Sequence, residues 1–371
     1  MTSDTRFLAP PGGPYLLAHS VGCQPVAARE ALERHVLAPW ADRGGGAWPD
    51  WLSAVDGFRA ALVRVLGGKA ADYCPQPNLS AGLFAILSSL PRQPGRDLIV
   101  VSAHTFPSLG FAAQQMERLG YRFACLAEGQ NPGDPATWDE ALSEAVAAVV
   151  VMHVHSNTGV VAPVAEITAM ARARGVFSVI DIAQSAGILP VEVGAWGAGA
   201  VIGSCVKWLC GGPGAGFLWV NPAEVDALEP LPVGWFSHAE PFAFDIRDFR
   251  YAPDARRFWG GTPSIAPYAL ATAGIDLIAE TGVAGVLAHN RTLIARIASR
   301  ADEAWRPQLD RTQRGGTVCL QPGAVIDTVA DRLSRSGCRF DRRGETLRLS
   351  FHLWNTLDDA DRVAECLSQV S

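Results

Sequence analysis

One lysine stands inside an otherwise apolar stretch, "VIGSCVKWLCGGPGAGFLWV", which covers residues 201 to 220. Burying a lysine costs free energy unless its ammonium group is neutralised or bonded to a partner. This residue, Lys207, follows an apolar run that ends at Ser204, and another apolar run, "VFSVID", ends in Asp181, 26 positions before the lysine. If the two runs are neighbouring parallel strands, these side chains meet at the carboxyl edge of the sheet, where such sheets bind ligands.

Two interpretations of Asp181 and Lys207 follow from their chemistry. The two side chains can form a buried structural ion pair. They can also serve pyridoxal phosphate, which needs a lysine to hold its aldehyde as a Schiff base. The same cofactor needs an aspartate to keep its pyridine nitrogen protonated, so that the ring withdraws electrons. The spacing of the two residues alone leaves both interpretations open.

A phosphate group would need backbone N–H donors, and the segment "PQPNLSAGLFAILSSL" offers them. Its prolines are followed by Asn78 and Ser80, both good N-cap residues, directly before an apolar helical pattern. We therefore expect Asn78, the backbone of Leu79 and Ser80 to form a phosphate cradle. The alternative is a helix with an ordinary N-cap.

The elements that must position these residues are indicated by the pattern between about residues 50 and 220. Short runs that are apolar throughout alternate with helical patterns such as "VAEITAMARARG" (164–175). Strands that are apolar on both faces and separated by helices indicate a parallel or mostly parallel sheet covered on both sides. The predicted strands are "DLIVVSA" (97–103), "AAVVVMHV" (147–154), "VFSVIDIA" (176–183), "GAVIGS" (199–204) and "GFLWV" (216–220).

The rest of the chain has a different organisation. Residues 221–263 are irregular and rich in prolines and aromatic residues, and a long helical stretch begins at "SIAPYALATAG". After it, "TVCLQPG", "VIDTVADRLSRSG", "CRF", "TLRLSFHLW" and "LDDADRVAECLSQV" predict a small α+β domain. We expect an N-terminal arm over residues 1–45 that packs with the small domain, a large domain over 46–255, and a connecting helix with the small domain over 256–371.

Composition excludes several classes of protein. The chain has 371 residues, a formal net charge of −6 and no block of more than two consecutive basic residues, which disfavours nucleic-acid binding. The first residues lack the pattern of a signal peptide, and the most apolar run is too short to span a membrane, so we expect a cytoplasmic protein. The 8 cysteines contain no CxxC pair and predict reduced thiols, with no metal site.

Four blocks in sequence order carry a family resemblance: "DIAQSAGILPVEV", "SCVKWLCGGPGAGFLWV", "WGGTPS" and "LRLSFHLWNTLDDADRV". They resemble fold-type I pyridoxal-phosphate enzymes of the class V aminotransferase group, which includes kynureninases and cysteine desulfurases. The resemblance runs from "YLLAHSVGCQP" (15–25) to the last helix. It implies an aspartate aminotransferase-like large domain with a small C-terminal domain, and pyridoxal 5'-phosphate as cofactor. It also implies Lys207 as the Schiff-base residue, Asp181 at the pyridinium nitrogen and Gln184 near the ring hydroxyl or the phosphate.

The same resemblance implies further site residues. Ser204 matches a phosphate contact, Phe106 in "HTFPSLGF" matches the phenyl ring that stacks on the pyridine, and Asn157 matches a residue that bonds the O3' oxygen. His104 is a second candidate for the stacking position. Thr262 in "GGTPS" matches a threonine that reaches the phosphate of the neighbouring subunit, which implies a homodimer. The expected substrate-binding residues are His19, Trp235 and Arg348, since an arginine fork binds a carboxylate through two hydrogen bonds.

The chain also departs from its relatives. Val206 stands where many of them have histidine or tyrosine before the lysine, and Leu109 and Thr262 differ from the aspartate and asparagine of kynureninases. Cys338 lies in a compact strand pattern and not in the long mobile loop that a desulfurase nucleophile needs. We therefore expect a pyridoxal-phosphate enzyme acting on a small α-amino acid, either an aminotransferase or a kynureninase-like lyase or hydrolase. Alternatives are a cysteine desulfurase or selenocysteine lyase-like enzyme, an epimerase and a non-catalytic relative.

Overall fold

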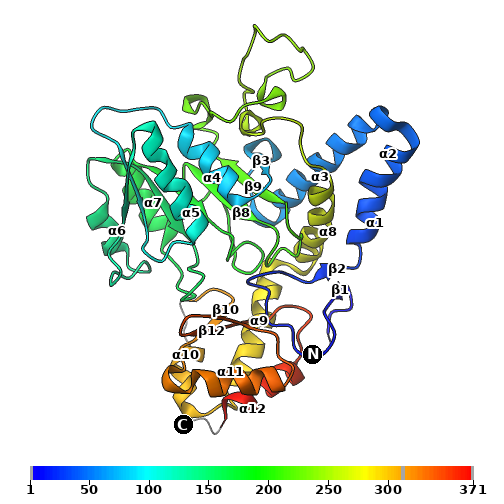
Figure 1. Cartoon of the computed structure of the whole chain (residues 1–371), viewed down its shortest axis with the longest axis vertical. Helices are drawn as coiled ribbons and strands as arrows, with labels where there is room; N and C mark the ends of the chain where they lie inside the picture. Colours follow the sequence, from blue (N-terminus) through cyan, green and yellow to red (C-terminus); the bar gives the residue numbers. More distant parts are fainter. Residues whose placement is uncertain (1–2, 311–313, 369–371) are drawn as a thin grey trace.

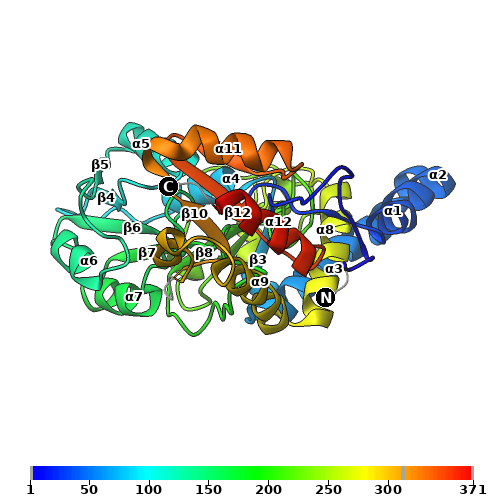
Figure 2. The same ribbon diagram turned by 90° about the horizontal axis from the view of Figure 1, so that it is seen from below.

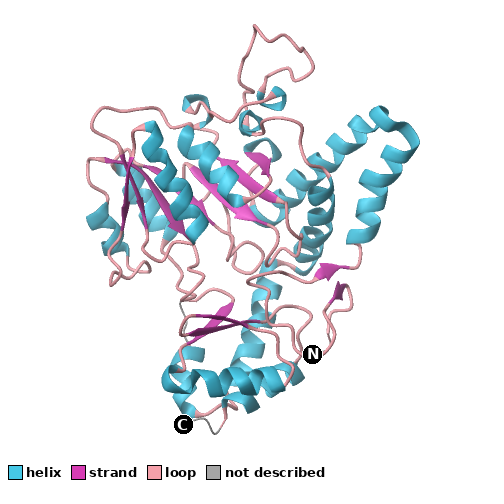
Figure 3. Ribbon diagram, in the orientation of Figure 1, coloured by secondary structure: helices cyan, strands magenta, loops and turns pink. Residues whose placement is uncertain are grey.

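A seven-stranded sheet forms the centre of the larger domain in the computed structural model, which describes residues 3–310 and 314–368 (Figures 1 and 3). Five strands are parallel, β9 is antiparallel to β8, and β3 is antiparallel to β9. The mostly parallel sheet predicted from the sequence is confirmed. In spatial order the strands are β3 (Tyr73–Gln76), β9 (Gly216–Val220), β8 (Ala200–Ser204), β7 (Phe177–Asp181), β6 (Val146–Met152), β4 (Leu98–Val101) and β5 (Arg122–Cys125).

Both faces of this sheet are buried against helices. Alternate residues of β6 enter two different apolar cores: Val149 and Val151 pack with α3 and α7, whereas Ala148 and Val150 pack with α4 and α5. A strand that is buried on both sides must be apolar throughout, and this explains the continuous apolar runs. The covering helices are α3 (Trp48–Leu66), α6 (Pro135–Ala141), α7 (Val164–Ala173) and α8 (Ala266–Thr281) on one face, and α4 (Leu79–Ser88) and α5 (Pro107–Gln115) on the other.

The long helical stretch after residue 263 is two helices, and the prediction of a single helix is wrong. α8 ends at Thr281, Gly282 adopts φ 75°, and α9 (Val283–Ala298) continues at 78° to α8. The positive φ suits glycine, which has no side chain to strain there. Within residues 3–310 and 314–368, no single helix is long and apolar enough to cross a membrane, although this bent pair meets the criteria of length and composition when taken together.

The small domain is an antiparallel three-stranded sheet with helices on one face, seen from below in Figure 2. On its central strand, Leu347 and Leu349 enter the small-domain core, and the alternate residues Thr346, Arg348 and Ser350 belong to the opposite face. The strand expected near "CRF" (338–340) begins only at Asp341. The elements are α10 (Arg306–Leu309), β10 (Thr317–Leu320), α11 (Ile326–Arg335), β11 (Asp341–Arg343), β12 (Thr346–Ser350) and α12 (Leu357–Leu367).

The N-terminal segment touches both domains. The backbone of Leu16 bonds to Arg339 and Ser350 of the small domain, and Gly22 donates to the carbonyl of Val206 at 2.8 Å. Two helices then extend away from the body of the molecule (Figure 1). This segment contains β1 (Phe7–Leu8), β2 (Gln24–Pro25), α1 (Ala28–Leu32), a π-helical turn (Glu33–Leu37) and α2 (Ala38–Arg43). Single 3-10 turns occupy Gly44–Ala47, Ala70–Asp72, Met116–Leu119, Val225–Ala227, Trp235–Ser237, Ala255–Phe258, Glu303–Trp305 and Gly323–Val325.

Candidate active site

A cavity of about 210 Å³ lies at the carboxyl edge of the parallel strands. It brings together most of the residues predicted from the sequence, and Ser108, Met152, Ser156 and Ala183 line it as well. The predicted residues that line this cavity are Asn78, Leu79, Ser80, Phe106, Asp181, Gln184, Ser204 and Lys207. Because β7 and β8 are parallel neighbours, their ends place Asp181 and Lys207 at the same edge.

Asp181 and Lys207 shift each other's ionisation inside this cavity. Burial lowers the pKa of Lys207, and the charge of Asp181 opposes that change. Burial raises the pKa of Asp181, while Lys207 and the backbone N–H of Ala183, which donates to Asp181 Oδ1 at 2.8 Å, act in the opposite direction. A largely buried lysine with a lowered pKa beside a buried carboxylate is typical of a reactive centre.

Phe106 forms one wall of the cavity. The lysine Nζ lies 5.6 Å from the centroid of the Phe106 ring, and the ring is placed by Pro107, the first residue of α5. Phe106 lines the cavity, whereas His104, the second candidate for the stacking position, is not among the lining residues described. A flat ligand ring between Phe106 and Lys207 would therefore have an aromatic face to stack on.

The N-terminus of α4 faces the cavity. Asn78 is its N-cap and accepts a hydrogen bond from the backbone N–H of Ala81 at 2.9 Å, so its side-chain oxygen is already used. Helix geometry leaves the N–H groups of Leu79 and Ser80 without intrahelical acceptors and gives this end a partial positive charge. Together with Ser204, these groups suit a phosphate. The two interpretations of this segment, a helix with an ordinary N-cap and a phosphate cradle, are therefore compatible at this helix end.

Gln184 lines the cavity, but its amide bonds to protein groups. Trp208 donates to its Oε1 at 3.2 Å, and its Nε2 donates to the carbonyl of His19 at 3.0 Å. Gln184 therefore connects the lysine loop to the N-terminal segment. No pattern in the sequence indicates this link.

Arg348 approaches the site from the small domain and already has partners. Its Nε donates to Asp341 Oδ1 at 2.7 Å, its Nη2 also bonds to the Asp341 carboxylate, and its Nη1 donates to the carbonyl of Ser156 at 2.9 Å. His19 lies beside this pair, with Nε2 3.4 Å from Asp341 Oδ1 and Nδ1 2.7 Å from the hydroxyl of Ser350. The two expected substrate residues are thus close together, and each contacts a residue of the cavity wall, Gln184 or Ser156, without lining the cavity itself.

Asn157 does not line the cavity, but its neighbour Ser156 does. The Oδ1 atom of Asn157 accepts a hydrogen bond from Nη1 of Arg343 at 2.8 Å. Sequence reasoning missed both Arg343 and Asp341. The signal that could have found them is "DRRGETLR", in which strand alternation puts Asp341 and Arg343 on one face.

Thr262 and Trp235 lie outside the cavity that contains Lys207. Trp235 Nε1 is 3.3 Å from Thr262 Oγ1, and Trp235 packs in an aromatic cluster with Phe236, Phe242 and Phe244. Neither residue lines the cavity of its own chain. Their expected roles therefore need another subunit or a different arrangement.

Cys338 is buried in the small-domain core, 5% exposed, and its pKa is raised by a hydrogen bond with Cys366 and by burial. The hairpin that follows it turns tightly between β11 and β12 at Gly344. The eight cysteines all lie in the described ranges, and they form no disulfide bond there. In the described part of the chain, no group of three or more His, Cys, Asp or Glu side chains has an arrangement that could hold a metal ion.

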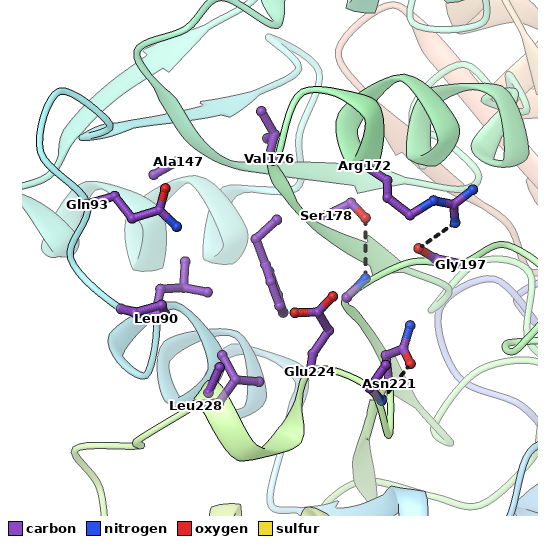
Figure 4. A pocket seen from close by; sticks show the side chains of 16 residues that line it. Leu90, Gln93, Ala147, Arg172, Val176, Ser178, Gly197, Asn221, Glu224 and Leu228 are labelled. Carbon is purple, nitrogen blue, oxygen red and sulfur yellow. Dashed lines mark hydrogen bonds between the residues drawn. The ribbon is translucent and has the colours of Figure 1, made fainter.

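A second cavity, of about 310 Å³, opens at the opposite end of the parallel strands, where β7 begins (Figure 4). It adjoins Val176 and Phe177 at the start of β7, and contains Arg172, Ser178 and Glu224. Ligands in open α/β sheets bind outside the carboxyl ends of the strands. The cavity that contains Lys207 is at that end, and it contains the reactive pair, so we assign the candidate active site there.

The residues of this cavity fit pyridoxal phosphate. Lys207 would hold its aldehyde, Asp181 its pyridine nitrogen, and Phe106 the face of its ring. The free N–H groups at the start of α4 and the hydroxyls of Ser80 and Ser204 are suited to its phosphate. The aldehyde, the pyridine nitrogen, the ring face and the phosphate of the cofactor would thus each have a partner of matching chemistry in one cavity.

Comparison with known proteins gives the family of this chain. Residues 79–321 match the family described as Aminotransferase class-V. The chain is 34% identical to a kynureninase of Deinococcus radiodurans over 275 residues, which is 72% of this chain and 65% of that protein. It is 31% identical to a kynureninase of Pseudomonas fluorescens over 300 residues, 76% of this chain and 68% of that protein. The matched region thus spans about two thirds of the length of these relatives.

Solved structures share the fold. An apo cysteine desulfurase from Thermococcus onnurineus NA1 superposes with a TM-score of 0.77 at 22% identity, covering 95% of this chain and 93% of that one. The cystine C–S lyase C-DES, in complex with its product cysteine persulfide, superposes with a TM-score of 0.81 at 21% identity, covering 96% and 97%. With the family match over most of the chain, these findings lead to one identification. The chain belongs to the class V aminotransferase family of pyridoxal-phosphate-dependent enzymes, with the fold-type I architecture and pyridoxal 5'-phosphate as its cofactor.

Proposed function

We propose that this protein acts on a small α-amino acid through Lys207, as an aminotransferase or a kynureninase-like lyase or hydrolase. The observation that carries the proposal is the pairing of a largely buried lysine with a buried aspartate in a cavity that also contains a helix N-terminus and an aromatic wall. A structural ion pair would need none of these additional groups. The relatives named kynureninase support the proposal.

The roles of the residues follow from their positions. Lys207 would hold the aldehyde of the cofactor, and its amine, when free, would move a proton at the substrate Cα. Its lowered pKa favours the neutral amine that this step needs. Asp181 would hold a positive charge on the ring nitrogen, and its burial would keep water from weakening that interaction. The cofactor supplies an electron sink for the electrons left at Cα.

Several classes of reaction can follow deprotonation. A sulfur-transferring desulfurase is disfavoured, because Cys338 is buried in the small-domain core and its pKa is raised. Kynurenine itself is disfavoured as the substrate, because Leu109 stands where kynureninases have an aspartate. Epimerisation, selenocysteine lyase-like cleavage and cofactor binding without turnover are also compatible with these residues. Cofactor binding without turnover is motivated by Val206, which departs from the family beside the lysine.

We also propose a homodimer in which Thr262 acts on the partner's site. Thr262 lies outside the cavity of its own chain and next to a segment, residues 242–249, that exposes large apolar side chains. Phe244 is 73% exposed and Ile246 is 96% exposed. Contiguous apolar exposure of this kind marks an interaction surface. The cytoplasmic location expected from the sequence belongs to the same proposal and stays a prediction.

The test uses the scarcity of lysine in this chain, which contains two, Lys69 and Lys207. Purified protein should be yellow, and borohydride should fix the cofactor to a peptide that contains Lys207. The Lys69→Arg variant should keep the label and the Lys207→Ala variant should lose it. A colourless protein that takes up no pyridoxal phosphate would contradict the proposal.

The class of reaction is tested on the same holoenzyme. Incubation with a panel of amino acids, followed by assays for keto acid, alanine, sulfide and inverted substrate, separates transamination from lyase, desulfurase and epimerase chemistry. Binding of the cofactor without any change in any amino acid would indicate a non-catalytic protein and contradict an enzymatic role.

A further inference from the structure

A fully buried histidine, His352, lies just after β12 and has no part in the chemistry described above. Its relative exposure is 0%. The imidazole stacks on two indole rings: its centroid is 4.4 Å from that of Trp354 at an interplanar angle of 12°, and 5.9 Å from that of Trp208 at 28°. A polar ring in such an apolar place is costly unless its nitrogens are hydrogen-bonded.

Both ring nitrogens of His352 have partners, and these partners fix the tautomer. The backbone N–H of Leu353 donates to Nδ1 of His352 at 2.8 Å, so Nδ1 carries no proton. The proton of the neutral ring is therefore on Nε2, which donates to the carbonyl of Trp208 at 3.1 Å. Burial lowers the pKa of His352 to about 4, so the ring is neutral at neutral pH.

The acceptor of this bond belongs to the loop between β8 and β9, residues 205–215, which we call the lysine loop. Trp208 follows Lys207 directly. The indole Nε1 of Trp208 donates in turn to Oε1 of Gln184 at 3.2 Å, and Gln184 follows Asp181 by three positions in the cavity wall. Trp208 thus connects the buried histidine with the segments that carry both members of the reactive pair.

His352 is itself fixed by contacts outside the lysine loop. Its backbone N–H donates to Oδ1 of Asn355 at 2.9 Å, and Nδ2 of Asn355 donates to the carbonyl of Tyr15 at 3.2 Å. Trp354, on which the imidazole stacks, donates from Nε1 to the same carbonyl at 3.0 Å. The small domain and the N-terminal segment therefore set the position of the imidazole, and the imidazole transmits that position to the lysine loop.

The Trp208 carbonyl depends on His352 for its hydrogen bond. Among the described residues, its one further donor is the thiol of Cys210, a weak donor whose sulfur lies 3.8 Å away. The surroundings of this carbonyl are tight, because a Cβ placed on Gly187 would be 3.0 Å from its oxygen. An apolar ring at position 352 could fill the space and stack, but it would leave a buried acceptor without a good partner. Packing alone therefore does not explain a histidine at this position.

We propose that His352 is a positioning residue for Lys207: its Nε2–H holds the Trp208 carbonyl and thereby fixes the direction in which the lysine enters the cavity. Because peptide groups are planar, a shift of this carbonyl turns the backbone torsions of the lysine loop and with them the side chain of Lys207. The inference rests on the proposed function, because it takes Lys207 as the residue that acts on cofactor and substrate. It gives the small domain a direct part in aligning a residue of the large domain.

The test uses two substitutions in the full-length protein that separate the hydrogen bond from the stacking. His352→Gln can place an amide N–H near the position of Nε2, whereas His352→Phe keeps an aromatic ring but has no donor. The affinity for pyridoxal phosphate is measured by calorimetry on cofactor-free protein, and the pH midpoint of the visible absorbance is measured on the holoenzyme. We expect His352→Phe to weaken cofactor binding about tenfold and to shift the midpoint. His352→Gln should stay within about threefold of wild type, with an unshifted midpoint.

His289→Phe is the matched control. His289 also bonds through Nε2 to a backbone carbonyl, that of Asn355 at 3.0 Å, in the same region of the molecule. This bond does not involve the lysine loop, so its loss should leave the cofactor affinity within about twofold of wild type and the midpoint unshifted.

A second readout needs no cofactor. Hydrogen exchange with mass spectrometry reports on the amides of Cys210 and Gly211, which bond to carbonyls inside the lysine loop. In cofactor-free protein, His352→Phe should speed exchange in lysine-loop peptides about tenfold relative to the central strands of the large sheet, and His352→Gln should not. A merely structural role would speed exchange throughout the chain and leave the affinity and the midpoint unchanged.

Three results would overturn the inference: wild-type affinity and midpoint in His352→Phe, equal losses in His352→Phe and His352→Gln, or an equal loss in His289→Phe. If His352→Phe does not fold, His352→Asn replaces it, because its shorter amide does not reach the Trp208 carbonyl. His352→Gln should then bind the cofactor about tenfold more tightly than His352→Asn, and equal binding would overturn the inference. Wild-type protein that takes up no pyridoxal phosphate would instead contradict the proposed function, and exchange in the lysine loop would still decide on His352.

Discussion

Asp341 holds an arginine that is almost fully buried, and this makes it a sensitive residue of the small domain. The Arg348 side chain is 3% exposed and that of Asp341 is 32% exposed. Removing one partner of such a pair leaves the other charge buried without compensation. We expect Asp341→Asn to lower the free energy of unfolding of the protein by about 3 kcal/mol, measured by urea denaturation at neutral pH.

The same pair has a defined pH dependence. Burial opposes ionisation of Asp341, but hydrogen bonds from His19 and Arg348 outweigh it and hold its pKa below the usual value of 3.8. A carboxyl group with a lowered folded-state pKa contributes stability that is fully present above its unfolded pKa and is lost as the pH falls below it. The difference between wild type and Asp341→Asn should therefore be equal at pH ~7 and pH ~5, and shrink only below pH ~4.

Asp327→Asn is the matched control for Asp341→Asn. Asp327 pairs with Arg342 on the surface, where the two side chains are 84% and 39% exposed. Exposed ion pairs contribute about 0–1 kcal/mol, so this variant should be nearly as stable as wild type. Equal costs for the two variants would show that the Asp341 pair is no more important than a surface pair.

At the scale of elements, the loop that carries Lys207 is held by the N-terminal segment. Gly22 donates its backbone N–H to the Val206 carbonyl, and a Cβ placed on Gly22 would lie 2.2 Å from the carbonyl oxygen of Lys207. The loop and the segment can approach this closely only because residue 22 lacks a side chain. The resemblance block "YLLAHSVGCQP" thus contains a packing requirement of the lysine loop as well as the expected substrate residue His19.

Gly22→Ala should therefore displace the lysine loop. We expect a loss of about 1–3 kcal/mol in the free energy of unfolding, as for other overpacked sites, and a lower cofactor content in the purified protein. Gly285→Ala in α9 is the control, because its Cβ would meet its nearest neighbour, Thr281, at an ordinary 3.5 Å. That variant should be neutral or more stable by up to about 1 kcal/mol. A Gly22→Ala protein with wild-type stability and full cofactor would refute this account of the loop.

The elements also show which parts of the fold were predictable. The five central strands are visible in the sequence as apolar runs because both of their faces are buried. The two strands that were not predicted, β3 and β5, are the edge strands of the sheet. β3 is four residues long and contains Pro75, which an edge strand tolerates, and β5 is partly exposed, so neither has a continuous apolar signal. The break at Gly282 was missed because the helical period continues on both sides of it.

The site was predictable to the extent that it depends on one sheet. Asp181 and Ser204 end their strands and Lys207 follows shortly after one, and the topology of parallel strands brings strand ends together. The contacts of Arg343 with Asn157 and of Arg348 with Ser156 join the small domain to the large one. The partners in these two contacts are 186 and 192 residues apart, and no local pattern encodes such a pairing.

At the scale of the whole molecule, the expected dimer depends on the exposed segment around Ile246. Phe244 stacks on Trp235, and Trp235 contacts Thr262, so a partner that covers this segment also approaches the threonine. Wild-type protein should run as a dimer of 39.4 kDa chains in size-exclusion chromatography with light scattering. Ile246→Asp should weaken the dimer, because a buried unpaired charge is costly. Leu8→Asp, at a residue 53% exposed outside this segment, should leave it intact.

The position of Thr262 across the interface can be tested with mixed dimers. Thr262→Ala and Lys207→Ala chains should each retain the cofactor poorly when they are alone, since one lacks the phosphate contact and the other lacks the covalent anchor. If Thr262 acts on the partner's site, a mixed dimer has one complete site, formed by Lys207 of the first chain and Thr262 of the second. Cofactor retention, measured by absorbance after dialysis of the mixed protein, should then recover in about half of the sites of each mixed dimer. If Thr262 acts within its own chain, no site in the mixed dimer is complete and mixing recovers nothing.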